Sequence, residues 1–320
     1  MIIVLYVILS AIIITAVILI ITANHFVNKL LIKTNKKLFE RKEKTKEEDE
    51  EKKLIKEKRK IWFEENQKDV YTVSCDNLKL HAHLINNNSN VYIIIVHPYE
   101  GRGSYMKYFI EKFYNMGFNV LAIDLRSHGE SEGNIYSLGY LERLDVLAWI
   151  KYINNNYNDE KIIPKIILYG ISMGANAVMM CSCENLNEAS NKDLNNVKAI
   201  IEDAGFTNAY EQLKERLDIA YKFSFLPIVE LTSIMSKIRL RFSFDDINVE
   251  KSVSKSKVPI LFIHGNKDEL VNCNMVHKLY NSCSSEKEKL IIKDGGHISA
   301  VMKDESLYWN TINNFINKYI

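Results

Sequence analysis

The 320-residue sequence is poor in the residues that interrupt or cross-link a chain, with 4 prolines, 12 glycines and 5 cysteines. So little proline and glycine excludes a collagen-like chain and a disordered chain rich in these two residues. The odd number of cysteines, and a Cys181-Ser182-Cys183 spacing that suits neither zinc nor redox chemistry, argue against a disulfide framework. A chain of this length can bury a core large enough to need no such staple.

An excess of charge of one sign is also missing, since 42 basic and 40 acidic side chains leave a net charge of +2. A balance this even argues against nucleic acid as a partner. The total hides a segregated chain, because residues 1–66 hold 14 basic and 10 acidic side chains whereas residues 67–320 hold 28 and 30. The larger, C-terminal part is therefore slightly acidic.

Residues 1–23 contain no charged side chain at all. An apolar run of about 20 residues is long enough to cross the hydrocarbon core of a bilayer as a helix. A cleaved signal peptide fits less well, because no basic residue precedes the run and the run is too long. The basic residues that first follow it are Lys29, Lys33, Lys36, Lys37 and Arg41. We predict a single-pass anchor of the cell membrane, with the C-terminal bulk in the cytoplasm by the positive-inside tendency.

Residues 24–66 separate this anchor from the rest of the chain. Positions 40–60 within them carry ten basic and eight acidic side chains. Mixed-sign runs of this kind form a solvated helix with i,i+4 pairs or a disordered spacer. We therefore predict a charged stalk, helical or disordered, over 24–66 and one globular domain over 67–320.

Residues 67–320 alternate between short apolar runs and helical patterns. The runs lie at 91–96, 119–123, 166–169, 199–201, 259–263 and 289–292. Unbroken β-branched runs of this length suit strands that are buried on both faces of a parallel sheet. Two alternating segments, 69–74 and 78–85, precede them and are typical of an antiparallel entry to such a sheet. The pattern predicts a doubly wound α/β domain with helices on both faces.

Residues 205–252 break this alternation, because they hold no strand-like run. They are rich in apolar and aromatic side chains, among them Phe206, Tyr210, Tyr221, Phe223, Phe225 and Leu226. We predict a helical insertion that packs on the domain. Such an insertion can also act as a cap that adds an apolar wall above the carboxyl ends of the strands.

The motif that carries chemistry is Gly170-Ile-Ser172-Met-Gly174, which directly follows the run at 166–169. G-x-S-x-G between a strand and a helix is the pattern of a nucleophile on a sharp turn, whose neighbours must lack bulky Cβ groups. The Ser172 hydroxyl would then lie at a helix N-terminus, where backbone N–H groups favour negative charge.

A serine hydroxyl needs a general base, and that base needs a third group to orient it. Asp268 follows the run at 259–263, and His297 follows the run at 289–292 in a glycine-containing loop. The order Ser172, Asp268, His297 is that of one particular triad fold. Asp203 also follows a strand-like run and is an alternative for the acid.

Six ordered motifs together resemble the α/β-hydrolase superfamily: His97–Gly101, Asp124–Ser131, Gly170–Gly174, Glu202–Gly205, His264–Asp268 and Gly295–His297. The chain is similar to monoglyceride-lipase-like, lysophospholipase-like and serine-aminopeptidase-like hydrolases, and to anchored bacterial hydrolases. The resemblance covers about residues 67–320. It implies a mostly parallel eight-stranded sheet with a helical cap, with Ser172 as nucleophile, His297 as general base and acid, and Asp268 as the residue that orients His297.

The resemblance also implies an oxyanion hole. Its donors would be the backbone N–H groups of Met173, which follows the nucleophile, and of Tyr99 in the loop after the run at 91–96. Pro98 departs from the usual His-Gly pattern of that loop. Proline has no N–H, but the expected donor lies one residue later.

Other polar residues point to structural roles. We expect Asp124, Arg126 and His128 to form an ion pair and a turn, and His264 to stabilise the loop before Asp268. His25, His81 and His83 have no partner at ligand spacing, so the sequence indicates no metal site and no cofactor.

We therefore expect a membrane-anchored serine hydrolase that cleaves a small-molecule carboxylic ester, acyl or lipid-like, through an acyl-enzyme. A peptidase or amidase on the same residues is the second interpretation, and a silent membrane scaffold is the third. Free cysteines fit the cytoplasmic placement. Anchored hydrolases of similar type often face outward, so the opposite orientation stays open.

Overall fold

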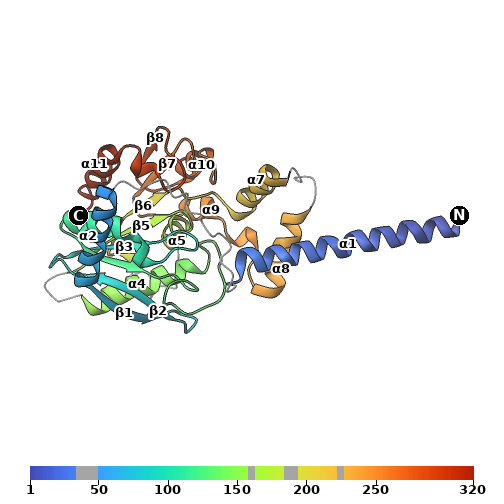
Figure 1. The fold of residues 1–320 in the computed structure, drawn as a ribbon, viewed down its shortest axis with the longest axis horizontal. Coiled ribbons are helices and arrows are strands. Elements are labelled where there is room, and N and C mark those ends of the chain that lie inside the picture. Colours follow the sequence, from blue (N-terminus) through green and yellow to red (C-terminus); the bar gives the residue numbers. More distant parts are fainter. Residues whose placement is uncertain (34–49, 158–162, 184–193, 222–226) are drawn as a thin grey trace.

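The computed structural model describes residues 1–33, 50–157, 163–183, 194–221 and 227–320. At its centre is an eight-stranded sheet with the order β1-β2-β4-β3-β5-β6-β7-β8 (Figure 1). The strands are β1 (Gln67–Val73), β2 (Lys79–Ile85), β3 (Val91–Val96), β4 (Asn119–Ile123), β5 (Lys165–Ile171), β6 (Val197–Asp203), β7 (Ile260–Gly265) and β8 (Lys287–Ile292).

The pairing follows the prediction of an antiparallel entry to a parallel sheet. β1 pairs antiparallel with β2, and β2 pairs antiparallel with β4. All pairs from β4 through β3 to β8 are parallel. The apolar runs are buried on both faces, with every residue of β3 and β4 buried. The carboxyl ends of the parallel strands therefore meet at one edge of the sheet, where the site lies.

Helices cover both faces of the sheet, as predicted. One face carries α4 (Glu142–Asn156), α5 (Met173–Cys181), α9 (Val249–Val253) and α10 (Asn274–Ser282). The other carries α2 (Glu50–Asn66), α3 (Lys107–Asn115) and α11 (Glu305–Ile316). Short 3-10 turns lie at η1 (Gly103–Met106), η2 (Phe244–Asp246) and η3 (Ala300–Met302). This architecture confirms the predicted fold class.

The insertion between β6 and β7 is helical, as expected from residues 205–252. It contains α7 (Ala209–Tyr221), α8 (Ile228–Leu240), η2 and α9. Its core includes Phe206, Phe242 and Phe244. Phe223, Phe225 and Leu226 of the predicted aromatic set lie outside the described residues.

The apolar N-terminal helix, α1 (Ile2–Leu31), is longer than the anchor that the sequence suggested. Its first two thirds project from the domain, and the N-terminus lies at the end of the molecule opposite the C-terminus (Figure 1). Ala23, Val27 and Leu31, spaced by four on one face, are buried where α1 packs against α8. Residues 24–31 are thus part of the cap rather than of a stalk.

The second part of the predicted stalk also packs on the domain. Residues 50–66 form α2, which buries Phe63 in the core beside α3 and joins Arg59 to Glu111 by a 2.6 Å ion pair. The sequence suggested a solvated spacer because charged side chains cover most of this helix. Residues 34–49 of the stalk lie outside the described residues.

Candidate active site

The three residues that the sequence predicts to be catalytic lie at the carboxyl edge of the sheet. Ser172 follows β5, Asp268 follows β7, and His297 follows β8. Because β5 to β8 are consecutive parallel strands, their loops converge above the same edge. The sheet thereby brings together three residues that are far apart in the sequence.

Ser172 occupies a strained turn between β5 and α5. Its φ of 55° and ψ of −115° lie outside the regions that a serine ordinarily adopts, and its N–H donates to the Asp203 carbonyl at 2.7 Å. A Cβ on Gly170 would lie 2.3 Å from the Gly174 carbonyl oxygen, so the turn can close only around glycine. This is the local reason for the G-x-S-x-G spacing.

Ser172, His297 and Asp268 form a continuous hydrogen-bonded chain. The Ser172 Oγ lies 3.0 Å from His297 Nε2, and His297 Nδ1 lies 2.7 Å from Asp268 Oδ2. In this arrangement Nδ1–H donates to the carboxylate, which leaves Nε2 free to accept the serine proton. Such a geometry can activate a serine hydroxyl as a nucleophile.

Asp268 is fixed from several sides. Its Oδ1 accepts the backbone N–H groups of Leu270 and Val271 at 2.8 and 2.9 Å. Burial alone would raise the pKa of Asp268, but hydrogen bonds from His264 and His297 outweigh it and hold this pKa well below its usual range. The carboxyl group is therefore ionised and aimed at His297.

Asp203, the alternative acid, faces another partner. Its Oδ2 accepts the Tyr308 hydroxyl at 2.7 Å, and among the described residues it makes no hydrogen bond to His297. Burial raises the pKa of Asp203 to about 6. The geometry thus favours Asp268 as the orienting acid.

The loop after β3 carries Tyr99 and is held by two neutral histidines. His97 Nδ1–H donates to the Pro98 carbonyl at 2.8 Å, and His97 Nε2 accepts the Leu125 N–H at 3.1 Å. His128 Nε2 accepts the Glu100 N–H at 3.3 Å. Burial, with the nearby His128, lowers the pKa of His97 to about 3, so this side chain stays neutral and keeps its acceptor.

The backbone N–H groups predicted as oxyanion donors are those of Tyr99 and Met173. Within the described residues, no hydrogen bond outside the regular elements is donated by the N–H of Tyr99. The N–H of Met173 belongs to the first residue of α5, where a helix offers no internal acceptor. Pro98 leaves the Tyr99 N–H intact.

The Tyr99 side chain connects this loop to α1. Its hydroxyl donates to the Leu30 carbonyl in the last turn of α1 at 3.0 Å, and its ring lies edge-on to Tyr136. The Tyr136 N–H in turn donates to the Leu31 carbonyl at 2.9 Å. The end of the apolar helix therefore packs directly on the loop that carries Tyr99.

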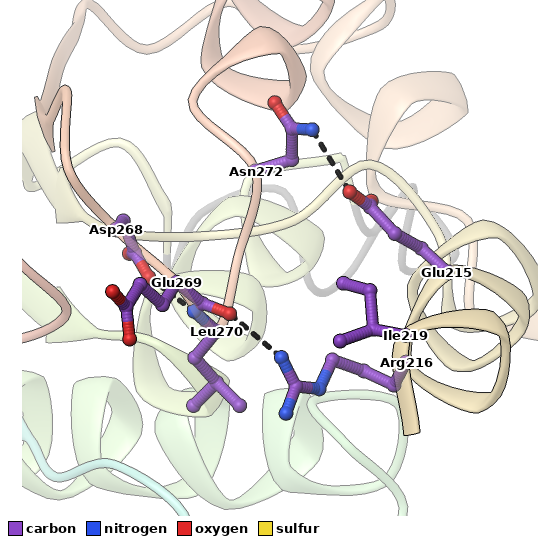
Figure 2. A pocket seen from close by; sticks show the side chains of 7 residues that line it. All are labelled: Glu215, Arg216, Ile219, Asp268, Glu269, Leu270 and Asn272. Atoms are coloured by element: carbon purple, nitrogen blue, oxygen red, sulfur yellow. Dashed lines mark hydrogen bonds between the residues drawn. The ribbon is translucent and has the colours of Figure 1, made fainter. Parts of the chain in front are cut away.

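Helix α7 borders the loop of Asp268 across a cleft of about 490 Å³ (Figure 2). Arg216 donates to the Glu269 carbonyl at 2.6 Å, and Asn272 donates to the Glu215 carboxylate at 2.8 Å. Ser172 and His297 are not among its lining residues. The cleft thus marks where the cap clamps the loop of Asp268 and is not the nucleophile's own pocket.

The cluster expected to be structural is buried and paired. The Arg126 guanidinium contacts Asp145 at 2.6 Å and Asp76 at 2.8 Å. Asp124 accepts from His81 at 2.8 Å and from the Gly103 N–H at 2.7 Å. These contacts tie the loop after β4 to the sheet and to α4.

The expectation that His81 and His83 lack a partner is wrong. Asp69 stands opposite His83 in the β1–β2 register, and Asp69, His81 and His83 offer ligand atoms within 4.8 Å of one another. Both ring nitrogens of His81 face carboxylates, at 2.8 Å from Asp124 and 3.0 Å from Asp69. Burial alone would lower the pKa of His81, but these hydrogen bonds raise it, so the cluster is satisfied as a charge network.

His264 has a larger role than the sequence indicated. Its Nε2 donates to the Val271 carbonyl at 3.0 Å and lies 3.3 Å from Asp268 Oδ2. It therefore contacts the same carboxylate oxygen of Asp268 as His297 does. The motif His264–Asp268 contained this residue, but only the folded loop gives its side chain a direction.

Comparisons with known proteins bear on the family and the fold. The family described as Serine hydrolase (FSH1) matches residues 143–303, half of the chain, and the family Serine aminopeptidase, S33 matches residues 87–192. The Bacillus subtilis protein YqkD is 25% identical over 65% of this chain and 65% of its own length. The zebrafish lysophosphatidylserine lipase ABHD12 is 24% identical over 54% of this chain and 41% of its own length.

Among solved structures, the Pyrococcus furiosus esterase Pf2001 superposes with a TM-score of 0.62 at 24% identity. The superposition covers 79% of this chain and 92% of the esterase chain. At this identity the likeness speaks for the fold alone.

Proposed function

The chain belongs to the serine hydrolases of the α/β-hydrolase fold, and we propose that it cleaves a carboxylic ester through an acyl-enzyme formed on Ser172. The observation that carries the proposal is the hydrogen-bonded chain from Ser172 through His297 to Asp268, at 3.0 and 2.7 Å. Serine, imidazole and carboxylate in this order supply the nucleophile, the base and its orienting charge.

In the first step the Ser172 oxygen attacks the ester carbonyl while His297 Nε2 takes the hydroxyl proton. The imidazolium then gives this proton to the leaving alkoxide, so an alcohol departs and an acyl-serine remains. Water repeats the sequence and releases the carboxylic acid. Asp268 keeps its negative charge throughout and stabilises the imidazolium.

We assign the oxyanion hole to the N–H groups of Met173 and Tyr99. The first lies at the N-terminus of α5, where the helix dipole adds to the attraction for negative charge. The second lies in a loop that His97 and His128 hold at both ends. Donors fixed in advance need no reorganisation as charge develops on the oxygen.

An acyl or lipid-like substrate is supported by the surroundings of the site. The cap contributes Phe206 and Phe242 to an apolar cluster that also includes Leu31 of α1 and Val271 and Met275, which follow β7. A membrane anchor would hold such a site beside its substrate, and the lipase named among the relatives acts on a lysophospholipid according to its name. We infer that α1 spans the membrane, because an 18-residue window with a mean hydropathy of 3.1 is entirely unburied.

The basic residues that follow the apolar run support a cytoplasmic catalytic domain. All five cysteines are free, which agrees with a reducing compartment. Protease shaving of intact cells tests this orientation, since loss of the domain from the cell surface would contradict it.

A peptidase or amidase is the second candidate, favoured by the match of residues 87–192 to a serine aminopeptidase family. Its nucleophile and base would be the same. A series of p-nitrophenyl esters from acetate to palmitate, set beside aminoacyl anilides, separates the two activities.

A fluorophosphonate probe tests the nucleophile. We expect it to label the purified protein and expect Ser172→Ala to abolish the label. Ser182→Ala is a matched control, because Ser182 is also a buried serine and lies at the far end of α5. Labelling that persists in Ser172→Ala would refute the assignment.

A further inference from the structure

The first two thirds of α1 are bare, and their length matches a bilayer. All residues from Met1 to Ile18 are exposed, and the first fully buried residue is Ala23. At 1.5 Å per residue, the exposed stretch is roughly 30 Å long, the thickness of the hydrocarbon core. With this stretch in the membrane, the surface of the leaflet lies close to Ala23, the first residue of α1 that is buried against α8.

Helix α8 is oriented by contacts on two of its sides. The Ser233 hydroxyl accepts the Phe244 N–H at 3.0 Å, and the Ser236 hydroxyl donates to the Phe242 carbonyl at 2.7 Å. These contacts turn one side toward the body of the cap. Arg239 donates to the Asn24 side chain at 2.6 Å, which turns a second side toward α1.

The remaining, exposed side of α8 carries two isoleucines beside the charged residues Glu230 and Lys237. Ile234 and Ile238 lie four residues apart and are 54% and 63% exposed. Ile219 on α7 is 61% exposed. Figure 1 shows that α7 and α8 form the end of the molecule from which α1 projects. Apolar side chains thus stand at the base of the apolar helix.

Charged residues frame this side of α8. Lys29 lies in the last turn of α1, and Lys237, Arg239 and Arg241 lie at the C-terminal end of α8. All four of these basic residues are exposed. An interfacial helix with isoleucines on one side and basic residues beside them suits the boundary between acyl chains and headgroups.

We propose that Ile234 and Ile238 form a lipid-contact face, by which the cap rests on the leaflet that α1 leaves. The occupant is the bilayer, because α8 packs against α1 at the point where the exposed apolar stretch of α1 ends. The Leu30 carbonyl, which accepts the Tyr99 hydroxyl, lies only about 10 Å along the helix from that surface. An ester in the leaflet would therefore reach the site without fully leaving the membrane.

The contact itself does not depend on the chemistry, whereas its benefit to catalysis rests on the proposed function. The direct test uses the full-length protein in phosphatidylcholine vesicles with brominated acyl chains, which quench tryptophan fluorescence. Ile238→Trp reports on the proposed face. Ile21→Trp reports on insertion of α1, and Ile163→Trp, at an equally exposed isoleucine before the amino end of β5, is the matched control.

We expect bromolipid to quench the added fluorescence of Ile238→Trp and Ile21→Trp at least twofold and to leave that of Ile163→Trp unchanged. Quenching of Ile21→Trp alone would overturn the lipid-contact face. Absence of quenching in both Ile21→Trp and Ile238→Trp would overturn it as well, because α1 would then not be inserted. If self-association at higher protein concentration protected Ile238→Trp from quenching, the face would be assigned to a second copy of the chain instead.

Kinetics then separate the contact from the proposed function. For a double variant, Ile234→Glu with Ile238→Glu, we expect about tenfold slower hydrolysis of a long-chain ester in vesicles. Hydrolysis of p-nitrophenyl acetate and fluorophosphonate labelling should be unchanged, as both should be in Ile163→Glu. Unchanged vesicle activity in the double variant would contradict the benefit of the contact to catalysis. If the wild-type protein hydrolysed none of the esters, this would contradict the proposed function, whereas the quenching result would still stand.

Discussion

Gly174 gives the sharpest test of how the oxyanion hole is built. It lies in the first turn of α5, directly against the end of β3. A Cβ added to Gly174 would lie 2.3 Å from the Val96 carbonyl oxygen and 2.7 Å from that of His97. Both contacts involve backbone atoms, so in Gly174→Ala the start of α5 must move from β3 by roughly 1 Å to regain van der Waals separation.

That movement separates the two proposed donors. The Met173 N–H is carried by α5, whereas the Tyr99 N–H is carried by the loop that follows β3. Loss of one oxyanion donor costs about 10²–10³-fold in kcat, and a displacement of 1 Å can cost about 10²-fold. We expect Gly174→Ala to lower kcat/KM for p-nitrophenyl acetate about 100-fold, equivalent to about 2.7 kcal/mol in the barrier.

Gly117→Ala is the matched control for this substitution. Gly117 has a φ of +92°, and a Cβ there would meet nothing within 4 Å. It should lower the stability by about 1 kcal/mol through backbone strain alone and leave kcat/KM unchanged. Activity of folded Gly174→Ala within threefold of wild type would refute the reasoning. So would equal losses of activity in both variants, because the effect would then follow stability rather than the hole.

Three further predictions test the charges around the site. Asp268→Asn should lower kcat by about 10³–10⁴-fold and Asp203→Asn by less than about tenfold, whereas equal losses would contradict the assignment of the acid. Arg126→Met should lower the free energy of unfolding by about 3–5 kcal/mol, because the Arg126 side chain is 3% exposed and its loss strands the buried carboxylate of Asp145. Arg59→Met, at a pair exposed by 19% and 29%, should cost less than about 1 kcal/mol, and similar shifts in thermal melts would contradict the difference. Burial lowers the pKa of His97 to about 3 from about 6.5 when unfolded, so its contribution to stability is full above pH 6.5 and is lost as pH falls toward 3. The melting temperature should therefore drop less between pH 7 and pH 5 in His97→Gln than in wild type, and an equal or larger drop would refute this sign.

The sheet and the site were predictable because their signals are local. Buried parallel strands read as unbroken apolar runs, and each of the runs at 91–96, 119–123 and 259–263 lies within or beside a strand of the structure. The turn at Ser172 requires glycine on both sides, which leaves a mark in the sequence itself. Placing Asp268 and His297 after neighbouring parallel strands was then enough to bring them to the same edge.

Contacts between distant segments left no such mark. The charged surface of α2 concealed Phe63, a single apolar side chain that fixes the helix to the domain. Asp69 lies opposite His83 because of the register in which β1 pairs with β2. The loop between the two strands sets that register. His264 belongs to the motif His264–Asp268, but its contact with Asp268 depends on how the loop folds back, and the motif does not show this.

The three loops of the site are each held by a different part of the molecule. The turn of Ser172 is closed by the sheet, since its N–H donates to the Asp203 carbonyl at 2.7 Å. The loop of Asp268 is clamped by α7, and the loop of Tyr99 is held by the last turn of α1 through a 3.0 Å hydrogen bond. Only the first of these supports belongs to the common core of the fold. The cap and α1 therefore do more than cover the domain, because they contact the loops that carry the proposed orienting acid and one of the proposed oxyanion donors.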